Sequence, residues 1–309
     1  MPMRSPEFFT PKFKAYLQRN WILYAMLLPT LILFAIFAYY PMYGVVMAFQ
    51  KFNPGLGFDG SPWVGMANFM RLYNSATFPR VSANTLIIAV SKLVSGQIAA
   101  IMLALLFNEL RVMWFKRTMQ NFLYMPHFLS WVVLGGILME ILSPMGLVGK
   151  AQEGLGMEPI IFLGNNDWFR PTVILTSLWK EAGWGMIIYM AALTSVDPGL
   201  YEAAAIDGAS RFQRVLYISI PTILPIIILM ACLSLGDILQ GGFDQIFNLY
   251  NPTVYQTGDI IDTYVYRMGL IDAKYGVAAA AGLFKSIIGF ILIVISYRLA
   301  DKYAGYKIF

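Results

Sequence analysis

Six long apolar segments dominate the chain, and shorter polar segments separate them. A helix needs about 20 predominantly apolar residues to cross the roughly 30 Å hydrocarbon core of a bilayer. Only helices and closed barrels satisfy all of their backbone polar groups there, and segments of this length favour helices. The pattern therefore predicts an all-α integral membrane fold with six transmembrane helices, at about residues 21–47, 82–107, 122–142, 171–193, 220–240 and 278–299.

The first apolar segment is predicted to be a retained anchor. It is longer than the apolar region of a signal peptide, and no small-x-small cleavage site closes it. Residues 1–20 before it combine Phe8, Phe9 and Phe13 with basic residues, which favours an amphipathic helix on the cytoplasmic leaflet. No segment between the spans is long enough for a second folded domain. We therefore expect residues 21–309 to form one transmembrane domain.

Composition and charge agree with this assignment and add an orientation. The chain is 58% hydrophobic and 13% charged, with a mean hydropathy of +0.63, as expected of a membrane protein. With the N-terminus inside, twelve lysines and arginines fall on the cytoplasmic side and seven outside, which is the expected bias. Both termini are thus predicted to be cytoplasmic. The net charge of +5 reflects membrane topology and gives no evidence of nucleic-acid binding.

Catalytic motifs are largely absent from the sequence. His127 is the only histidine and Cys232 the only cysteine, so no His/Cys metal site or internal disulfide is expected. Residues 146–151 contain Gly-Lys, but the glycine spacing of a phosphate-binding loop and its Ser/Thr are missing. A chain of this kind that moved a solute would need an ion gradient or a separate ATPase. His127 itself fits either a structural hydrogen bond or proton handling.

The polar segment 194–219 is predicted to be a docking element. Residues 202–205, Glu-Ala-Ala-Ala, form a small-residue helical turn that lipid does not require, but whose small side chains let a partner protein approach closely. Local signals indicate a helix, a sharp stop and a second helix at the membrane face. These signals are an N-cap with proline, a glycine stop and a capping box: Asp197, Pro198, Gly208, Ser210 and Gln213.

Ionisable residues within the apolar segments are candidates for a polar pathway, because each is costly when it faces lipid. They can equally pair with one another or extend to the membrane surface. Aromatic residues near them can stack on sugar rings, although membrane-interface and packing roles are common for such rings. The candidate pathway residues are Lys92, Lys180, Glu181, Trp184, Tyr189, Asp237, Phe243 and Lys285.

The docking element carries a family resemblance. Glu202-Ala203-Ala204 is followed by Gly208, Ile218 and Ile220-Pro221 at a characteristic spacing. This pattern resembles the signature loop of permease subunits in binding-protein-dependent ABC importers, with isoleucine where the family usually has leucine before the proline. The resemblance implies a type I importer permease fold with a cytoplasmic coupling helix.

Other segments resemble the sugar branch of that family. Residues 63–69 are similar to the external segment after the first helix of maltose-type permeases. Residues 243–247, 263–267 and 282–286 resemble permeases for oligosaccharides or polysaccharide fragments such as alginate or pectin-derived chains. The resemblance thus implies an importer subunit of a bacterial cell membrane whose substrate is an oligosaccharide.

The resemblance also implies partners and roles. A second permease chain, two ATPase subunits and an extracytoplasmic solute-binding protein are expected, with ATP and magnesium bound by the ATPases. This chain would bind no cofactor or metal and would catalyse no covalent reaction. The residues expected to couple it to an ATPase are Glu202, Ala203, Ala204, Asp207 and Gly208.

Two other classes remain open from the residues alone. A gradient-driven secondary carrier could use Lys92, Lys180 and Glu181, but it would not need the docking element, and internal repeats typical of that class are not evident. A membrane-embedded enzyme would need clustered histidine, aspartate or cysteine at one depth, which a single His and a single Cys disfavour. Dependence of transport on a co-expressed ATPase separates the importer from both.

Overall fold

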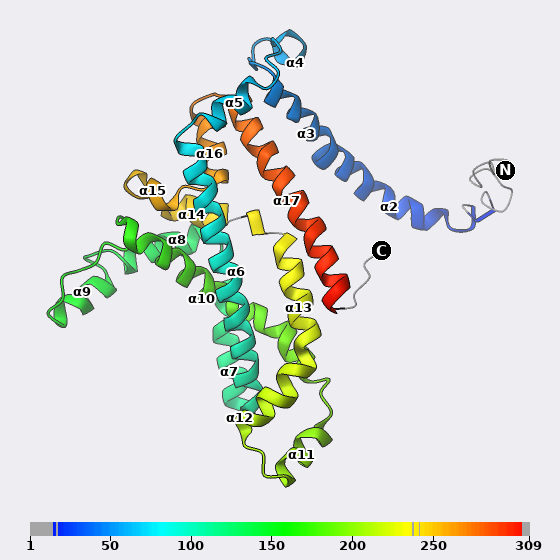
Figure 1. Cartoon of the computed structure of the whole chain (residues 1–309), viewed down its shortest axis with the longest axis vertical. Coiled ribbons are helices and arrows are strands. Elements are labelled where there is room, and N and C mark those ends of the chain that lie inside the picture. The colour runs from blue at the N-terminus through cyan, green and yellow to red at the C-terminus, as the bar shows by residue number, and fades with distance from the viewer. Residues whose placement is uncertain (1–14, 17, 237, 241, 305–309) are drawn as a thin grey trace.

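The computed structural model describes residues 15, 16, 18–236, 238–240 and 242–304, and these residues form helices joined by loops (Figure 1). The first two predicted spans correspond to a composite helix and to one long helix. The first half of the chain comprises α2 (Trp21–Phe34), the π-helix η2 (Ala35–Tyr39), α3 (Tyr40–Met42), the 3-10 helix η3 (Tyr43–Phe49), α4 (Gly57–Gly60), α5 (Ala67–Tyr73), α6 (Thr77–Glu109), α7 (Met113–Tyr124), the 3-10 helix η4 (Met125–Phe128), α8 (Trp131–Ile141) and α9 (Leu147–Gly154).

The second half contains three long helices separated by short ones. It comprises α10 (Asn166–Leu193), α11 (Pro198–Ile206), α12 (Arg211–Arg214), the π-helix η5 (Val215–Ser219), α13 (Ile220–Gly236), the 3-10 helices η6 (Ile238–Gln240) and η7 (Pro252–Val254), α14 (Phe243–Leu249), α15 (Tyr255–Gly258), α16 (Ile261–Tyr266), the π-helix η8 (Arg267–Ile271) and α17 (Tyr275–Ala304). The proposed amphipathic segment 1–20 lies mostly outside the described residues.

Among the described residues, four helical segments are long and apolar enough to cross a membrane: Trp21–Phe49, Thr77–Glu109, Arg211–Gly236 and Tyr275–Lys302. A fifth is reached if the bent pair α7–η4 and α8 counts as one span. Five of the six predicted spans therefore meet this criterion, one of them as a bent pair. The difference is α10, which has 28 residues but carries Lys180 and Glu181 near its middle. A helix that packs against protein on several sides does not need an apolar surface all round.

The third predicted span, residues 122–142, is not one straight helix. Met113–Phe128 and Trp131–Ile141 meet at an angle of 105°. Two local features explain the break. Pro126 has no N–H for a continuing helix, and Ser130 starts α8 as an N-cap by accepting a hydrogen bond from Val133 N at 3.3 Å. His127 therefore lies at the bend and not at the end of a straight span.

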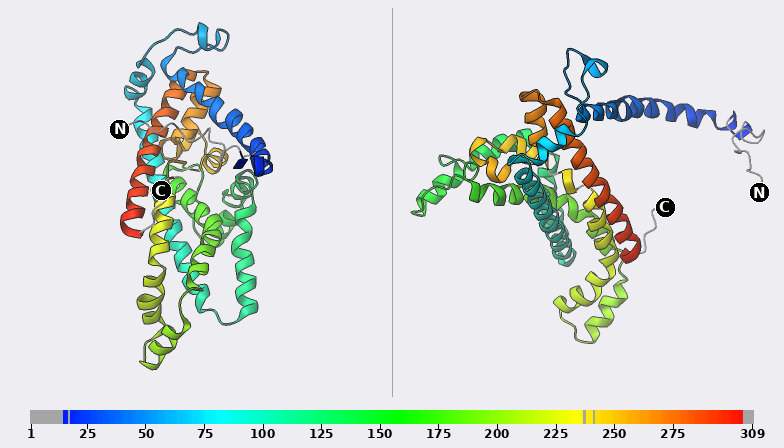
Figure 2. Two further views of the ribbon diagram at one scale, coloured as in Figure 1. Left: turned by 90° about the vertical axis from the view of Figure 1, so that its right-hand side faces the viewer. Right: turned by 45° about the horizontal axis from the view of Figure 1, so that its top comes forward.

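The long helices α6 and α10 lie side by side and form the centre of the molecule, with α7 and α13 packed against α10 (Figures 1 and 2). Gly183 of α10 allows the close approach of α7, because a Cβ at this position would overlap the carbonyl oxygen of Leu123. Small residues at helix crossings are typical of membrane proteins. A core of seven buried residues fills this region: Ala100, Ala104, Phe107, Met186, Tyr189, Leu193 and Ile223.

The molecule has two distinct ends. α11 forms one of them, here called the elbow end, whereas α4, α5 and α16 lie at the opposite end, here called the loop end (Figure 1). The long segment α2–η3 leads away from the body at the loop end, and none of the residues in α2 is buried. α17 starts at the loop end and runs beside α13 toward the elbow end (Figures 1 and 2).

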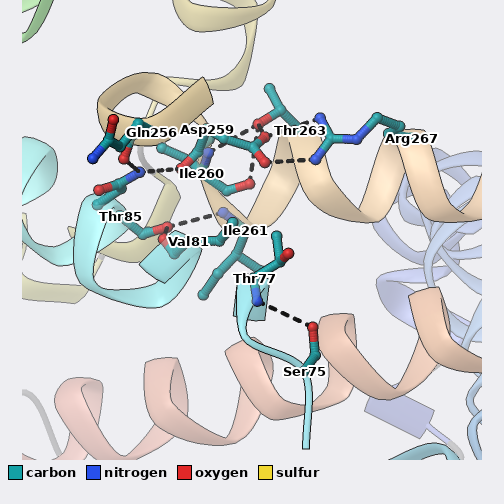
Figure 3. Close-up of polar contacts among 11 residues, drawn as sticks. Ser75, Thr77, Val81, Thr85, Gln256, Asp259, Ile260, Ile261, Thr263 and Arg267 are labelled. Atoms are coloured by element: carbon teal, nitrogen blue, oxygen red, sulfur yellow. Dashed lines mark hydrogen bonds and ion pairs between the residues drawn. The ribbon is translucent and has the colours of Figure 1, made fainter. Parts of the chain in front are cut away.

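Hydrogen bonds to backbone groups fix the loop end (Figure 3). Buried Asn84 of α6 donates to the carbonyl oxygens of Gln256 and Asp259, at 3.1 and 2.9 Å. Thr85 accepts a hydrogen bond from Ile261 N at 2.9 Å. These bonds attach the segment around α15 and α16 to α6, and they satisfy backbone groups that the short helices leave unpaired.

Candidate functional site

The predicted docking element is an exposed helix-turn-helix at the elbow end (Figure 1). Asp197 caps α11 by accepting a hydrogen bond from Gly199 N at 2.9 Å, and Pro198 is the first helical residue. The helix ends at Gly208, whose φ of +81° is a conformation that favours glycine. Ala209 N then donates to Ala204 O at 2.9 Å, which closes the turn. The predicted cap and helix stop are confirmed.

The second arm of the elbow also follows its sequence signal. Ser210 and Gln213 form a reciprocal capping box, with distances of 3.3 and 2.7 Å between side chain and backbone. α12 continues through η5 into α13. One side-chain bond joins the two arms, since the Tyr201 hydroxyl lies 2.8 Å from Ser219 Oγ. The elbow is thus attached directly to α13, through η5.

The surface of the elbow is suited to a protein partner. α11 has no buried residue, and Glu202, Ala203, Asp207 and Gly208 are all exposed, with Ala204 half-buried. Ile206, next to Asp207, is 87% exposed in a segment where lipid is not expected. An exposed apolar side chain rimmed by polar groups is typical of an interaction site.

A polar cluster occupies the bend between η4 and α8. His127 Nδ1 lies 2.7 Å from Glu181 Oε2 on α10, and Lys180 Nζ donates to His127 O at 2.6 Å. Lys180 also lies 3.4 Å from Glu181 Oε1. These contacts join the bend to the middle of α10 and supply the backbone carbonyl at the break with a donor, as non-helical backbone inside a membrane requires.

Aromatic rings surround this cluster. The Trp184 ring stacks on the His127 ring, with centroids 4.5 Å apart and an interplanar angle of 2°. Lys180 Nζ lies 5.7 Å from the ring centroid of Trp131 on α8, within range of a cation–π interaction. Of the predicted pathway residues, Lys180, Glu181 and Trp184 are therefore brought together, and Lys180 is buried.

A cavity of about 290 Å³ lies next to this cluster. Lys92 of α6 and Glu181 of α10 line it together with Trp131. Gly242 forms another wall, and a Cβ there would lie 2.6 Å from Lys92 Nζ. Gln245 is fully buried at the same cavity, and its Oε1 has no hydrogen-bond partner among the described residues. The cavity therefore offers a cation, a carboxylate, an amide oxygen and an indole ring, which are groups that bind sugars.

A larger cavity of about 820 Å³ adjoins the first and shares Trp131 and Gly242 with it. Phe243 and Asp244 of α14 line one side. On the other side Lys285 of α17 forms an ion pair with Asp262 of α16, with 2.5 Å between Nζ and Oδ1. The two cavities together form a space with polar and aromatic lining residues, whose walls come from α6, α8, α10, α13, α14, α16 and α17.

The structure separates the predicted pathway residues into three groups. Lys92, Glu181, Phe243 and Lys285 line the two cavities, and Lys180 and Trp184 support the bend beside them. Tyr189 is 2% exposed and packs in the core around Met186, so it belongs to the packing and not to a cavity wall. Asp237 lies outside the described residues.

Sequence reasoning overlooked four cavity residues: Trp131, Asp244, Asp262 and Gln245. Asp262 and Gln245 lie in segments that the hydropathy pattern assigns to external loops. Polar residues are expected in such loops, so nothing in the sequence distinguished these two as unusual. The helix break Pro126–Ser130 was a readable signal for Trp131, because non-helical backbone at membrane depth commonly lines a polar space. Within the part of the chain that is described, no three His, Cys, Asp or Glu side chains gather to hold a metal ion.

Helices long and apolar enough to cross a membrane, cavities with polar lining residues among the helices and an exposed elbow are together typical of a multi-pass membrane transport subunit. Residues 96–304 match the family of binding-protein-dependent transport system inner membrane components. The chain belongs to this family.

Individual relatives agree over nearly the whole chain. The chain is 43% identical to the polygalacturonan/rhamnogalacturonan transport system permease protein YteP of Bacillus subtilis (strain 168), covering 91% of this chain and 88% of that protein. It is 42% identical to Protein LplB of the same organism, covering 94% and 91%. A crystal structure of a bacterial ABC transporter involved in the import of the acidic polysaccharide alginate contains a chain with a TM-score of 0.87 and 39% identity, covering 94% of this chain and 99% of that one.

These similarities confirm the predicted class. The protein is a permease component of a binding-protein-dependent ABC importer, with the all-helical type I permease fold, and it resides in a membrane. It is a transport component and not an enzyme. The alternative of a gradient-driven carrier, left open by the residues alone, is excluded by the family.

Proposed function

We propose that this chain pairs with a second permease and transmits ATP-driven movement from two ATPase subunits through its elbow. The observation that carries this proposal is the exposed, doubly capped α11–α12 elbow with Ile206 at its tip. Glu202, Ala203, Ala204, Asp207 and Gly208 would contact an ATPase, which would hold the ATP and magnesium. Because η5 and α13 follow α12 directly, movement of the elbow would tilt α13 and thereby open or close the cavities.

The orientation follows from the same proposal. The elbow end would face the cytoplasm, and the loop end would face the extracytoplasmic side, where a solute-binding protein delivers the substrate. Both termini would then be cytoplasmic, as the distribution of lysine and arginine also predicts. α10 would cross the membrane as the sixth span, shielded from lipid by α6, α7 and α13.

The proposed substrate class is an oligosaccharide or polysaccharide fragment that carries carboxylates. Two relatives point to it by name, since polygalacturonan is a polymer of uronic acid and alginate is an acidic polysaccharide. The cavities fit such a chain chemically. Lys92 and Lys285 supply cations, Trp131 and Phe243 supply ring faces, and Asp244 and Asp262 can accept bonds from hydroxyl groups.

The test is ATPase stimulation of the assembled importer in proteoliposomes, with binding protein and an oligogalacturonate added. Glu202→Ala removes the carboxylate of the elbow, and Gly208→Trp forces a bulky side chain into the φ of +81°. Matched controls are Glu153→Ala on α9 and Gly156→Trp just after it, since Gly156 is also exposed and has a φ of +74°. We expect stimulation to be lost in the elbow variants only.

Two outcomes would contradict the proposal. Stimulation that survives in assembled Gly208→Trp would show that the elbow is a passive connection. Transport that follows a proton or sodium gradient, with no ATPase co-purifying, would contradict the ATP-driven mechanism itself. A requirement for neutral in place of acidic oligosaccharides would leave the coupling intact and change only the substrate class.

A further inference from the structure

A further cavity, of about 460 Å³, lies at the loop end, and its charged lining residues are mainly basic. Its walls come from the end of α5, the start of α6, the α15–α16 segment, η8 and the loop before α17. Four cations and one carboxylate face it: Arg71, Arg80, Arg267, Lys274 and Asp259.

The single carboxylate is already occupied. Asp259, whose side chain is 1% exposed, accepts hydrogen bonds from Arg267 Nη1 and Nη2 at 3.2 and 2.5 Å (Figure 3). It also accepts one from Thr263 Oγ1 at 2.8 Å. Burial alone would lower the pKa of Arg267, but the hydrogen bonds and charge of Asp259 outweigh it and raise this pKa above its usual value. This ion pair therefore forms the neutral floor of the cavity.

The rim of the cavity, in contrast, has an excess of positive charge. Arg71, Arg80 and Lys274 are exposed. Arg71 and Arg80 form no ion pair with any described residue, and Lys274 reaches only Asp272, at 3.4 Å. Three cations gathered from three separate elements around one concave site create a local field that attracts anions.

This cavity, here called the basic cavity, is separate from the two cavities described above, here called the translocation cavities, although α16 contributes to both regions. Asp262 of α16 faces the larger translocation cavity, where it pairs with Lys285. Tyr264 of α16 and the following Arg267 face the basic cavity instead. A sugar that moves through the translocation cavities would not need to enter the basic cavity, whereas a protein that docks on the loop end would cover its rim.

We infer that the rim cations Arg71, Arg80 and Lys274 receive acidic side chains of the solute-binding protein when it docks. This inference rests on the proposed function, which places the loop end on the extracytoplasmic side. Charge complementarity at the rim of an interface mainly accelerates association and makes it sensitive to salt. The rim would thus guide the binding protein onto the permease in a defined position.

The test measures the concentration of solute-binding protein that half-saturates ATPase stimulation of the complete importer in nanodiscs. The probe is the solute-binding protein of the same importer, purified and saturated with an oligogalacturonate. Exposed surface ion pairs are individually weak, so all three rim cations are replaced together by glutamine in Arg71→Gln/Arg80→Gln/Lys274→Gln. The matched controls are Lys51→Gln and Lys150→Gln, two exposed lysines that do not line this cavity.

We expect the half-saturating concentration to rise about fivefold or more in the triple variant at low salt and to stay unchanged in both controls. High salt should shrink the difference, because it screens exposed charges. Size-exclusion elution at the wild-type position shows that the triple variant is assembled. Lys274→Gln alone is a milder substitution, and it should raise the half-saturating concentration by a smaller factor.

Three outcomes would overturn the inference. The first is an unchanged half-saturating concentration in the assembled triple variant. The second is an equal shift in the two controls, which would indicate a nonspecific charge effect. The third is weakened binding of free pentagalacturonate with unchanged binding-protein affinity, which would assign the cavity to the sugar. If wild-type importer shows no stimulation by binding protein at all, the proposed function fails and not the docking site alone.

Discussion

Replacing Asp259 by alanine should cost the protein about 3 kcal/mol of stability. The carboxylate is buried and accepts two hydrogen bonds from Arg267 and one from Thr263. Removing one partner of a buried ion pair costs roughly 3–5 kcal/mol because the remaining charge is left without compensation. The Arg267 side chain is 18% exposed, so water can partly replace the lost carboxylate, and the lower end of that range applies.

Thermal unfolding of the purified protein in detergent measures this effect. A loss of about 3 kcal/mol corresponds to a fall in Tm of roughly 5 °C for a chain of 309 residues, at an unfolding entropy of about 2.1 cal/mol/K per residue. The matched variant is Asp259→Asn, which keeps the shape and one acceptor oxygen but removes the negative charge. Because Arg267 is then left without a compensating anion and one of its two bonds loses its acceptor, this variant should lose most of the same stability.

A double-mutant cycle with Arg267→Ala separates the ion pair from other effects. If the buried pair is responsible, Asp259→Ala/Arg267→Ala should be less destabilised than the sum of the two single variants by at least about 1.5 kcal/mol. Additive losses would refute the reasoning, because they would mean that the two side chains stabilise the loop end independently. A Tm within about 2 °C of wild type in Asp259→Ala would refute it as well.

Three further predictions test the elbow, the helix crossing and the translocation cavity. Tyr201→Phe removes the hydroxyl that bonds to Ser219, and it should lower the free energy of unfolding by about 1 kcal/mol and reduce stimulated ATPase activity in proteoliposomes. An unchanged ATPase rate would contradict a role for this bond in coupling. Gly183→Leu should abolish accumulation of folded protein in the membrane, because α7 and α10 cannot approach; normal yield on size exclusion would contradict the crossing. Lys285→Met should reduce both oligogalacturonate uptake and the Tm, because it leaves Asp262 unpaired. The double variant Lys285→Met/Asp262→Leu should recover the Tm but not the uptake. Recovery of both would show that the ion pair is purely structural.

Local signals in the sequence predicted the elbow in detail. The caps at Asp197 and Ser210, and the stop at Gly208, each depend on hydrogen bonds within a few residues, and such bonds form wherever the right side chains are adjacent. The apolar length criterion likewise located α6, α13 and α17, because lipid acts on every residue of an exposed span.

The rest of the fold depended on contacts between distant segments. The bend at Pro126 is stable because Lys180, more than 50 residues later, donates to the His127 carbonyl oxygen. α10 can carry Lys180 and Glu181 because α6, α7 and α13 surround it. Periodicity within one segment contains no information about such partners. For the same reason the sequence identified Lys92, Glu181 and Lys285 as unusual but gave no reason to connect them with Trp131 or Asp262.

The short helix α16 links the two sites at the loop end. At its two ends Asp259 and Arg267 form the floor of the basic cavity, and between them Asp262 reaches the translocation cavity and pairs with Lys285 of α17. α16 has only six residues, and Thr85 of α6 accepts a hydrogen bond from its first residue, Ile261. The basic cavity and the larger translocation cavity therefore depend on the same short segment for their ion pairs, and a substitution that displaces α16 is expected to disturb both pairs together.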